Sequence, residues 1–389
     1  MKVVIVGGGA IGSSSAYHLA THPGFRGEIT VVERDPTYAR ASSMLSASGI
    51  RQQFSTPVSI RMSQYGLAFI RDAGRALAVD GDAPLLAFKE HGYLFLASEA
   101  GEAVLRENVA LQRHEGADVE LLDPAGIAGK FPWISTEGLA AGAFGASGEG
   151  SFDGPAMLQA LRRRARSLGV RYVAQEASGF VRAGDAVTGV RLADGTVLDC
   201  DAAVVSAGAW SGKVAGFLGI DMPIVPRKRM VYVISCREKL PRCPLVIDPT
   251  GNWFRQEGEL FLCGRSPGEG EPDPDEPKLE VTEDMFNDYV WPALAARVPA
   301  FEAVKISSSW AGYYELNLFD HNGIVGQHPA VPNVVFAAGF SGHGMQHSPA
   351  TGRGVSELVA DGEFTTLDLS PLGWQRLIEN RPMWEKNVV

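Results

Sequence analysis

The sequence has few cysteines, no excess of basic side chains and no long apolar run. Its four cysteines, Cys200, Cys236, Cys243 and Cys263, form no CxxC pair, which argues against a disulfide framework and a zinc ribbon. This usage fits a reducing compartment, so we expect a cytoplasmic protein. We expect neither a cleavable leader nor a transmembrane segment, because no stretch of about twenty apolar residues is available to cross a bilayer. With 35 basic and 45 acidic residues the net charge is −10, which argues against nucleic acid as a partner.

Chain length, apolar residues and turn formers are all plentiful. The chain has 389 residues, of which 45% are apolar, and this is more than one compact core normally holds. We therefore expect two joined domains. The 45 glycines and 23 prolines indicate many short elements connected by tight loops.

The N-terminus has the pattern of a βαβ unit. Residues 2–6 and 29–32 are mostly apolar and β-branched and predict two strands, and the small residues of 10–20 have the spacing of a helix between them. Gly7, Gly9 and Gly12 form a GxGxxG motif at the turn into this helix, and Glu33 ends the second strand. In a dinucleotide-binding fold such glycines allow a tight turn and close approach of a pyrophosphate to the helix N-terminus, while the acidic residue binds the ribose hydroxyls. A glycine-rich turn without a ligand is the less favoured alternative.

The rest of the chain alternates between helices and strands. Residues 202–207 and 333–338 are apolar except for Ser206 and Asn333, and they predict strands buried on both faces of a parallel sheet. Asp194-Gly195 predicts a hairpin turn. The polar segment 268–277 predicts a solvated loop, and a lid over the substrate entrance is the less favoured alternative. The other predicted strands are 170–174, 187–192, 196–200, 229–235, 252–256, 260–263 and 305–314, and the helices are 57–72, 99–114, 155–167, 283–297 and 350–360.

This order of elements favours FAD over NAD as the dinucleotide. The chain re-enters the predicted parallel sheet only at 202–207 and again at 333–338, and each strand ends in a turn of small residues. A flavin dinucleotide is long, and its ring must be held by segments far from the first βαβ unit. We therefore predict an α/β fold with a discontinuous Rossmann-type FAD-binding domain (1–84, 150–220 and 325–370). An antiparallel-sheet α+β substrate domain (85–149 and 221–324) and a C-terminal tail (371–389) complete the chain.

Several motifs together resemble the D-amino-acid oxidase (DAO) superfamily of flavoproteins, which includes glycine oxidase, sarcosine oxidase and dimethylglycine dehydrogenase. They are SGIRQQF (48–54), VVSAGAWS (204–211), WAGYYE (310–315) and the segment 336–359. Within this superfamily, segments 311–329 and 365–371 are most similar to the FAD-dependent oxidoreductase domain proteins associated with respiratory complex I assembly. The resemblance implies a glutathione-reductase-2-like fold and an FAD-dependent amine or amino-acid oxidoreductase.

The resemblance also implies which residues contact the cofactor. The cysteine that tethers flavin in sarcosine oxidase aligns with Gly312, so non-covalent FAD is expected. The lysine that promotes oxygen reduction aligns with Leu262, which favours a dehydrogenase that passes electrons to a quinone or an electron-transfer protein. An oxidase that uses O2 as acceptor is the alternative. The implied cofactor residues are Gly7, Gly9, Ala10, Ile11, Gly12, Glu33, Arg34, Ala41, Ser42, Ser43, Ser48, Gly49, Val173, Ala207, Gly208, Trp210, Gly312, Gly339, Ser341, Gly342, His343, Gly344, Met345 and Gln346.

The family's usual carboxylate anchors are missing from this chain. The matching positions hold Phe54, Tyr314 and Gln346. A carboxylate in a dry pocket still needs charge-assisted donors, so a replacement must come from elsewhere.

Two arginines are candidates for that replacement. Trp253 aligns with an active-site tyrosine of glycine oxidase, and strand alternation places Arg255 on the same face as Trp253. Arg255 is therefore the first candidate and Arg51 the second, with Gln346 as a further substrate contact. Tyr313, Tyr314 and His343 are the candidate catalytic residues, and His343 is suited to relay a substrate proton.

These residues predict oxidation of the C–N bond of a small amino acid or N-substituted amino acid by hydride transfer to flavin. Two alternatives remain, oxidation of a 2-hydroxy acid and a flavin-bearing assembly factor without turnover. His343 and His347 are four residues apart, but the neighbouring glycines indicate a turn rather than a helix face, and no metal site is expected. The oligomeric state is left open.

Overall fold

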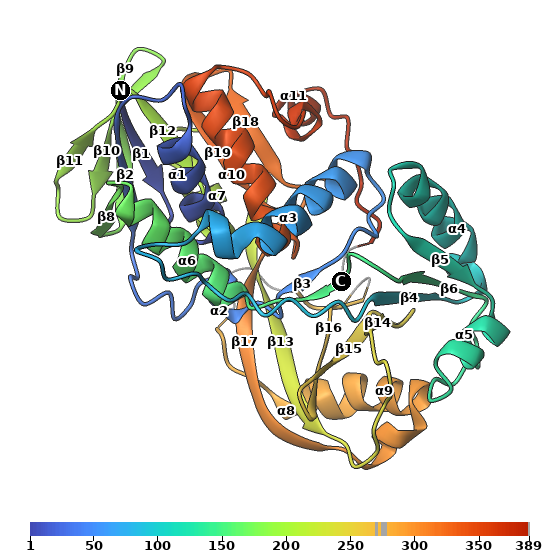
Figure 1. Ribbon diagram of the computed structural model, residues 1–389. Coiled ribbons are helices and arrows are strands. Elements are labelled where there is room, and N and C mark those ends of the chain that lie inside the picture. Colours follow the sequence, from blue (N-terminus) through green and yellow to red (C-terminus); the bar gives the residue numbers. More distant parts are fainter. Residues whose placement is uncertain (269–270, 274–277, 388–389) are drawn as a thin grey trace.

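A six-stranded sheet forms the centre of the first lobe in the computed structural model, which describes residues 1–268, 271–273 and 278–387 (Figure 1). Five strands run parallel, and the edge strand β18 is antiparallel to β19. The N-terminal, middle and C-terminal parts of the chain all contribute strands, as the sequence predicted. In spatial order the strands are β18 (Ile324–His328), β19 (Val331–Ala338), β12 (Ala202–Val205), β1 (Lys2–Val6), β2 (Glu28–Glu33) and β8 (Arg171–Ala174).

Both faces of this sheet are covered, which explains why its central strands are almost entirely apolar. Helices α1 (Ala10–Thr21), α3 (Pro57–Ala76), α6 (Gly154–Ser167) and α10 (Gly344–Ala360) share one core with side chains from one face. On the other face lie α7 (Ser211–Gly216) and a sheet of β9 (Ala177–Ala183), β10 (Ala186–Leu192) and β11 (Val197–Asp199). The predicted hairpin is confirmed, because β10 and β11 pair antiparallel and Gly195 has φ +87°.

Helix α10 begins at Gly344, six residues before the predicted start at 350. The glycines of this segment indicated a turn, and Gly342 does have φ +88°. The turn ends there, however, and His343 is already the N-cap of the helix. The helix N-terminus consequently points into the space between the lobes, where a ligand can use its free N–H groups.

An eight-stranded sheet forms the second lobe, and all its neighbouring strands are antiparallel except β14 and β4. The short strands β4, β5, β6 and β14 were not predicted. They are nearly continuous apolar segments without the alternation that identifies a half-buried strand. The order is β17 (Lys305–Asn317), β13 (Ile224–Ser235), β16 (Leu260–Arg265), β15 (Asn252–Glu257), β14 (Leu245–Ile247), β4 (Tyr93–Ala97), β6 (Ala141–Gly145) and β5 (Val119–Leu122).

Helices pack on both faces of this second sheet. Helix α4 (Glu99–His114) covers one face, and the segment 283–297 covers the other. That segment was predicted as one helix, but a π-helical turn interrupts it, because Pro292 has no N–H to donate to the preceding turn. The segment comprises α8 (Glu283–Met285), η2 (Phe286–Val290) and α9 (Trp291–Arg297). Shorter elements are α2 (Ser42–Leu45), β3 (Gly49–Ile50), α5 (Pro124–Lys130), β7 (Gly150–Ser151), η1 (Gly208–Trp210), η3 (Pro299–Ala303), η4 (Ser370–Leu372) and α11 (Gln375–Ile378).

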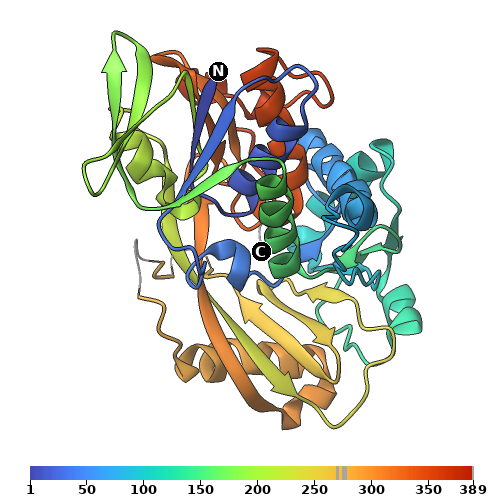
Figure 2. The ribbon, with the colours of Figure 1, turned by 60° about the vertical axis from the view of Figure 1, so that its left-hand side comes forward.

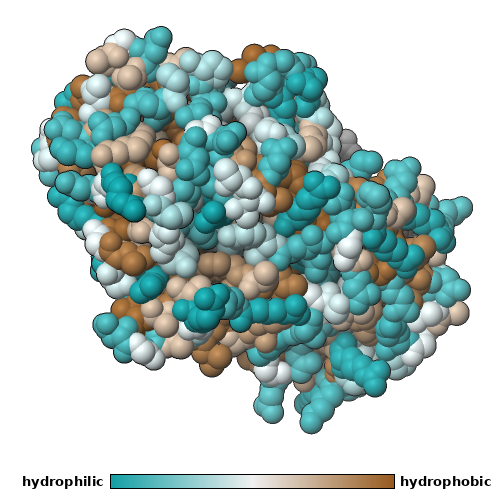
Figure 3. Space-filling model, turned by 45° about the horizontal axis from the view of Figure 1, so that its top comes forward, coloured by the Kyte–Doolittle hydropathy of each residue, from teal (hydrophilic) through white to brown (hydrophobic). Residues whose placement is uncertain are grey.

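Two long strands connect the lobes. Strands β13 and β17 are paired from Ile224 and Asn317 at one end to Ser235 and Lys305 at the other, and Figure 2 shows them running from the first lobe along the second. Polar side chains cover most of the face drawn in Figure 3. Within the described residues, no helix has the length and apolar character needed to span a membrane.

The predicted C-terminal tail folds back onto the molecule. Arg376 forms a buried ion pair with Asp320 at 2.7 Å, and residues 381–387 then run beside the start of α3 and beside α4 (Figure 1). The division of the chain into the two predicted domains remains a prediction.

Candidate active site

One cavity extends from the β1–α1 turn of the first lobe to strands β13–β16 of the second. Most residues predicted to contact the cofactor line it. These are Gly7, Gly9, Ala10, Ile11, Glu33, Arg34, Ala41, Ser42, Ser43, Ser48, Gly49, Ala207, Gly208, Trp210, Gly312, Gly342, His343, Gly344, Met345 and Gln346.

Four predicted cofactor residues lie outside the cavity wall: Gly12, Val173, Gly339 and Ser341. Gly12 lies beneath the first turn, where a Cβ atom would be 1.9 Å from the carbonyl oxygen of Gly7. Ser341 accepts a hydrogen bond through its Oγ from the backbone N–H of Asn317 at 3.1 Å. Both residues therefore support the shape of cavity-lining turns.

The β1–α1 turn is built to bring backbone close to a ligand. Gly7 has φ +99°, a conformation that favours glycine. Only Ser43 Oγ lies within 4 Å of a Cβ built on Gly9, so the rest of that space is open cavity. The carboxylate of Glu33 accepts from the backbone N–H of Gly8 at 2.8 Å, and this contact holds it beside the turn. These residues fit the pyrophosphate and adenosine of a dinucleotide.

Stacked side chains close the wall next to this turn. The Arg34 guanidinium lies 3.8 Å above the ring of Trp210, and that ring meets Tyr313 edge-on with centroids 4.8 Å apart. Arg40 donates to the Tyr313 hydroxyl at 2.6 Å. Tyr313 is therefore held in the cofactor end of the cavity by contacts on both sides.

Tyr314 fixes the loop before α10. Its hydroxyl donates to the backbone carbonyl of Ser341, and burial raises its pKa above the ordinary value. The phenol is neutral and its proton already takes part in the hydrogen bond to Ser341, so Tyr314 is not suited to act as a base.

Arg51 is a buried cation in the cavity wall. Its side chain packs against the rings of Phe54 and Phe95, with the guanidinium 4.2 and 5.1 Å from their centroids. Every hydrogen-bond partner of its guanidinium in the described part of the chain is uncharged: the carbonyls of Gln53 and Asn387, and the His343 ring. Among the described residues, none offers it a carboxylate within 4 Å. A buried guanidinium of this kind favours binding of an anion.

His343 is neutral at physiological pH. Burial, reinforced by the charge of Arg51 and by His347, holds its pKa well below the usual range. His343 Nε2 lies 3.1 Å from Arg51 Nη2, and since arginine only donates, this ring nitrogen is the acceptor. The lone pair that a proton relay would use is thus already engaged, which argues against the relay role we predicted.

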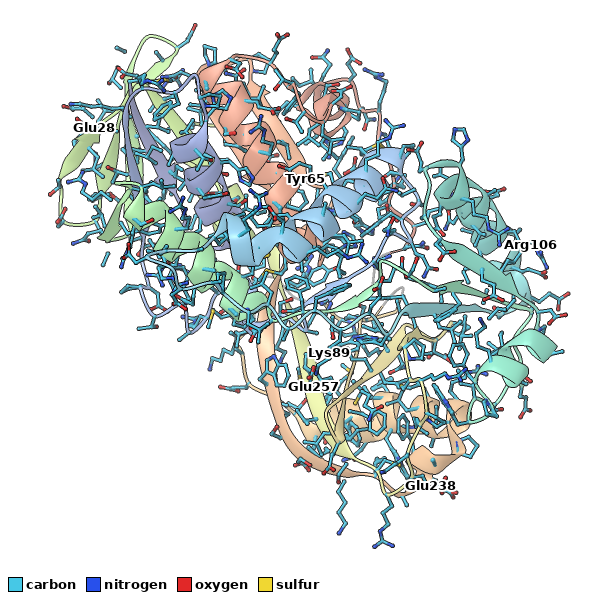
Figure 4. All side chains as sticks on the ribbon, in the orientation of Figure 1. Glu28, Tyr65, Lys89, Arg106, Glu238 and Glu257 are labelled. Atoms are coloured by element: carbon cyan, nitrogen blue, oxygen red, sulfur yellow. The ribbon has the colours of Figure 1, made fainter. Side chains whose placement is uncertain are left out.

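Arg255, the first candidate for the carboxylate anchor, lies outside the cavity wall. Trp253 lines the cavity, but Arg255 is farther along β15 and is buried against other groups. It forms an ion pair with Glu257 and donates to the Ala47 carbonyl at 2.9 Å. Glu257 also pairs with Lys89 at 2.9 Å (Figure 4). The alternation of side chains along β15 places Arg255 on the same face as Trp253, as predicted. It did not reveal that Glu257, two residues farther along, forms an ion pair with this arginine.

Two cavity-lining arginines were missed by the sequence prediction. Arg229 lies 4.7 Å above the ring of Tyr314 and forms a double hydrogen bond with Asp273, at 2.9 and 3.0 Å. Arg265 forms a similar pair with Glu271. Both carboxylates belong to the predicted solvated loop 268–277, of which residues 269–270 and 274–277 lie outside the described residues. The described part of this loop therefore contacts the cavity wall. The sequence feature that could have predicted this contact is the combination of arginines in the strands with acidic residues in the loop.

Glu315 was also missed. It lines the cavity, and burial raises its pKa to about 7 although it accepts hydrogen bonds from the backbone of Gly339 and Phe340. A Cβ atom on Gly344 would be 2.8 Å from its Oε1, so Glu315 lies at the start of α10 on the cofactor side.

The two histidines of this region do come together. Their ring centroids are 5.9 Å apart, because His343 caps α10 and His347 lies on its first turn, so the predicted turn geometry was wrong here. His347 Nε2 is 3.0 Å from the Ser63 hydroxyl. Within the described ranges, no group of three or more His, Cys, Asp or Glu side chains has the arrangement of a metal site.

Comparisons with known proteins agree with this geometry. The sequence pattern of the family described as FAD dependent oxidoreductase (DAO) matches residues 2–358. FAD-dependent oxidoreductase domain-containing protein 1 of Xenopus laevis is 45% identical, over 100% of this chain and 84% of that protein. The 4-methylaminobutanoate oxidase (formaldehyde-forming) of Paenarthrobacter nicotinovorans is 27% identical, over 93% of this chain and 44% of that protein.

Solved structures support the fold. The L-proline dehydrogenase of P. horikoshii superposes with a TM-score of 0.85 at 24% identity, covering 98% of both chains. At this identity the likeness concerns the fold, a Rossmann-type FAD-binding part joined to a substrate part. From the matched family pattern and the 45% identical relative, the chain belongs to the DAO family of FAD-dependent oxidoreductases, and FAD is its cofactor.

Proposed function

We propose that this protein oxidises the C–N bond of a small amino acid or N-substituted amino acid. The observation that carries the proposal is Arg51, a buried guanidinium in the cavity wall with only uncharged partners in the described part of the chain. In this proposal Arg51 binds the substrate carboxylate in place of the anchors that the chain lacks. The activities named for a relative and a structural neighbour, on 4-methylaminobutanoate and on L-proline, support this class of substrate.

The reaction removes two electrons and a proton from the substrate. When bound, FAD would supply the acceptor for a hydride from the carbon next to nitrogen. Hydride loss from the neutral amine leaves an iminium ion, which water hydrolyses to a carbonyl compound and the smaller amine. The side chains of the site orient the substrate and exclude water: Arg51 holds the carboxylate, while Trp253 and Tyr93 form apolar walls of the cavity. The N-terminus of α10 stabilises negative charge that develops beside it.

The substrate amine reacts in its unprotonated form in this proposal. His343 is neutral with Nε2 engaged, and Tyr314 is a committed donor, so neither residue is available as a base. The amine consequently loses its proton to solvent as it binds, and activity should rise with pH towards the pKa of the free amine.

The identity of residue 262, a leucine, supports our proposal for the electron acceptor. This residue is buried among Val231, Val233 and Trp253, and it occupies the position that matches an oxygen-activating lysine. Without that cation, reoxidation by O2 should be slow, which favours a quinone or an electron-transfer protein. Gly312 lines the cavity and has no side chain to form a flavin linkage, so denaturation should release FAD intact.

An anaerobic titration of the flavoprotein tests the proposal. We expect sarcosine, proline or a related amino acid to bleach the visible flavin band in the wild-type protein. Arg51→Gln should raise the concentration needed at least about thirtyfold, which corresponds to about 2 kcal/mol for the loss of a buried charged partner. Dimethylamine, which has no carboxylate, should act equally poorly on both proteins.

The same titration separates the alternatives. If lactate or another 2-hydroxy acid bleaches the flavin and no amine does, the reaction class is wrong. If neither class of compound reduces the flavin, the result favours a flavin-bearing assembly factor without turnover.

A further inference from the structure

The C-terminal segment Glu385–Asn387 lies directly against the residues that surround Arg51. Asn387 accepts a hydrogen bond from the Arg51 guanidinium through its backbone carbonyl. Its side-chain amide donates to the carbonyl of Gln53 at 3.1 Å and accepts from Asn108 of α4 at 3.2 Å. The segment therefore contacts both Arg51 and the carbonyl of Gln53 that Arg51 also uses.

Glu385 holds this segment in place through hydrogen bonds to its carboxylate. Only 2% of its surface is exposed, and its carboxylate accepts from the backbone N–H of Ser55 at 2.9 Å and from the Ser55 hydroxyl at 2.8 Å. It also accepts from the backbone N–H of Asn387 at 3.0 Å. The buried carboxylate is thus fully used in joining residues 55 and 387, and it makes no ion pair with Arg51.

This arrangement positions Arg51 without a direct ion pair. Burial lowers the pKa of the guanidinium, and the charges of Glu385 and Glu149 oppose that effect through space. An ion pair with Glu385 would compete with any anion that enters the cavity, whereas a carbonyl acceptor fixes the guanidinium without cancelling its charge. His343 Nε2 performs the same function from the other side at 3.1 Å. A long arginine side chain loses considerable rotamer entropy when it is ordered, so fixing it before the ligand arrives strengthens binding.

We propose that Glu385–Asn387 is a positioning element for Arg51 and thereby sets the preference of this site for carboxylate ligands. The inference rests on the proposed function, because it assigns a role to a neighbour of the proposed anchor. None of these three residues lines the cavity. Its effect is transmitted through the Asn387 carbonyl and the shared contact with Gln53.

The test compares binding of acetate and acetamide to the FAD-containing, full-length protein. Both probes have the same shape, but only acetate carries a charge, and binding of each is followed by the change in the visible flavin spectrum. We expect Glu385→Ala, and a shorter chain ending at Trp384, to weaken acetate binding about tenfold and leave acetamide binding unchanged. Glu385→Gln keeps one acceptor and should fall between wild type and Glu385→Ala.

Lys386→Ala is the matched control. The side chain of Lys386 is about half exposed, and its backbone N–H to Ser55 survives the substitution, so both probes should bind as in wild type. Circular dichroism and the flavin content per chain identify a variant that fails to fold, and Glu385→Gln then carries the comparison.

Three outcomes are distinguishable. If Arg51→Gln selectively weakens acetate but the Glu385 variants do not, the positioning role is overturned while the anchor stands. If Arg51→Gln itself leaves the acetate preference intact, the proposed function loses its anchor. If Glu385→Ala weakens acetate and acetamide equally, the segment has only a structural role.

Discussion

Arg51 Nη2 lies 3.1 Å from Nε2 of His343, and this contact fixes the chemistry of both side chains. The guanidinium can only donate, so the imidazole is neutral with its proton on Nδ1. Histidine next to a flavin site would ordinarily be considered an acid or a base. Here His343 instead accepts a hydrogen bond that holds Arg51, the cation that we propose as the substrate anchor.

A substitution of His343 distinguishes support from proton transfer. His343→Ala removes an acceptor from Arg51, so KM for an amino-acid substrate should rise about tenfold. The pH profile of kcat should keep its shape, because His343 has no accessible ionisation near neutral pH. Steady-state kinetics between pH 6 and 10 measure both quantities, and His343→Gln, which keeps an acceptor, is the control. Disappearance of an ionisation from the kcat profile of His343→Ala would restore the proton relay.

The fold, and the residues that line the cavity at the β1–α1 turn, could be predicted from the sequence because local patterns determine them. Gly7, Gly9 and Glu33 lie within one βαβ unit, and the strands at 202–207 and 333–338 are recognisable because nearly all their residues are apolar. The resemblance of the sequence motifs to the DAO superfamily then implied the other cofactor residues, and most of these line the cavity.

The substrate end could not be read in the same way, because it depends on long-range pairing. The sequence ranked Arg255 above Arg51 and did not single out Arg229, because only the folded chain reveals which charges are already paired. Arg255 and Arg229 meet Glu257 and Asp273, whereas Arg51 meets a carbonyl more than 330 residues away in the chain. That last contact has no local signature at all.

Release of Arg229 from its ion pair should change ligand preference. Asp273→Asn removes the carboxylate that occupies this cavity-lining arginine, so a second carboxylate on a ligand gains a partner. We expect malonate to bind at least about threefold more tightly relative to acetate in the variant, as measured from the visible flavin spectrum. Asp185→Asn, which alters an exposed pair with Arg182, is the control and should have no effect. An unchanged ratio of malonate to acetate affinity would show that Arg229 does not reach the ligand.

Glu149 should make stability depend on pH. It is buried beside Arg51, and burial raises its pKa to about 7 although Gln52 and Gln53 donate hydrogen bonds to it. The folded state therefore binds a proton more tightly than the unfolded state. This contribution is fully present below the unfolded pKa of about 4.5 and is lost as pH rises to about 7, by up to about 3 kcal/mol.

The variant Glu149→Gln isolates this effect, because an amide does not titrate. Urea unfolding of both proteins at a series of pH values gives the difference in free energy of unfolding. The wild type should lose stability relative to the variant between pH 4.5 and 7, and the difference should be constant above that range. A difference independent of pH would mean that Glu149 keeps an ordinary pKa in the folded protein.

A substitution of Gly9 allows FAD binding at the β1–α1 turn to be tested separately from folding. A Cβ atom at this position meets only Ser43 Oγ, at 3.3 Å, and otherwise projects into the cavity. Gly9→Ala should therefore fold without FAD as stably as the wild-type apoprotein. The methyl group blocks the close approach of backbone and pyrophosphate, so FAD affinity should fall at least about tenfold.

Gly216→Ala is the matched control for Gly9→Ala, since nothing lies within 4 Å of the added methyl group in α7. Thermal midpoints of the two apoproteins and FAD titration by flavin fluorescence give the stability and the affinity. Gly216→Ala should retain FAD and gain a little helix stability. Wild-type FAD affinity in Gly9→Ala would mean that the pyrophosphate lies elsewhere in the cavity, whereas a lowered apoprotein midpoint would mean that Gly9 serves the fold and not the ligand.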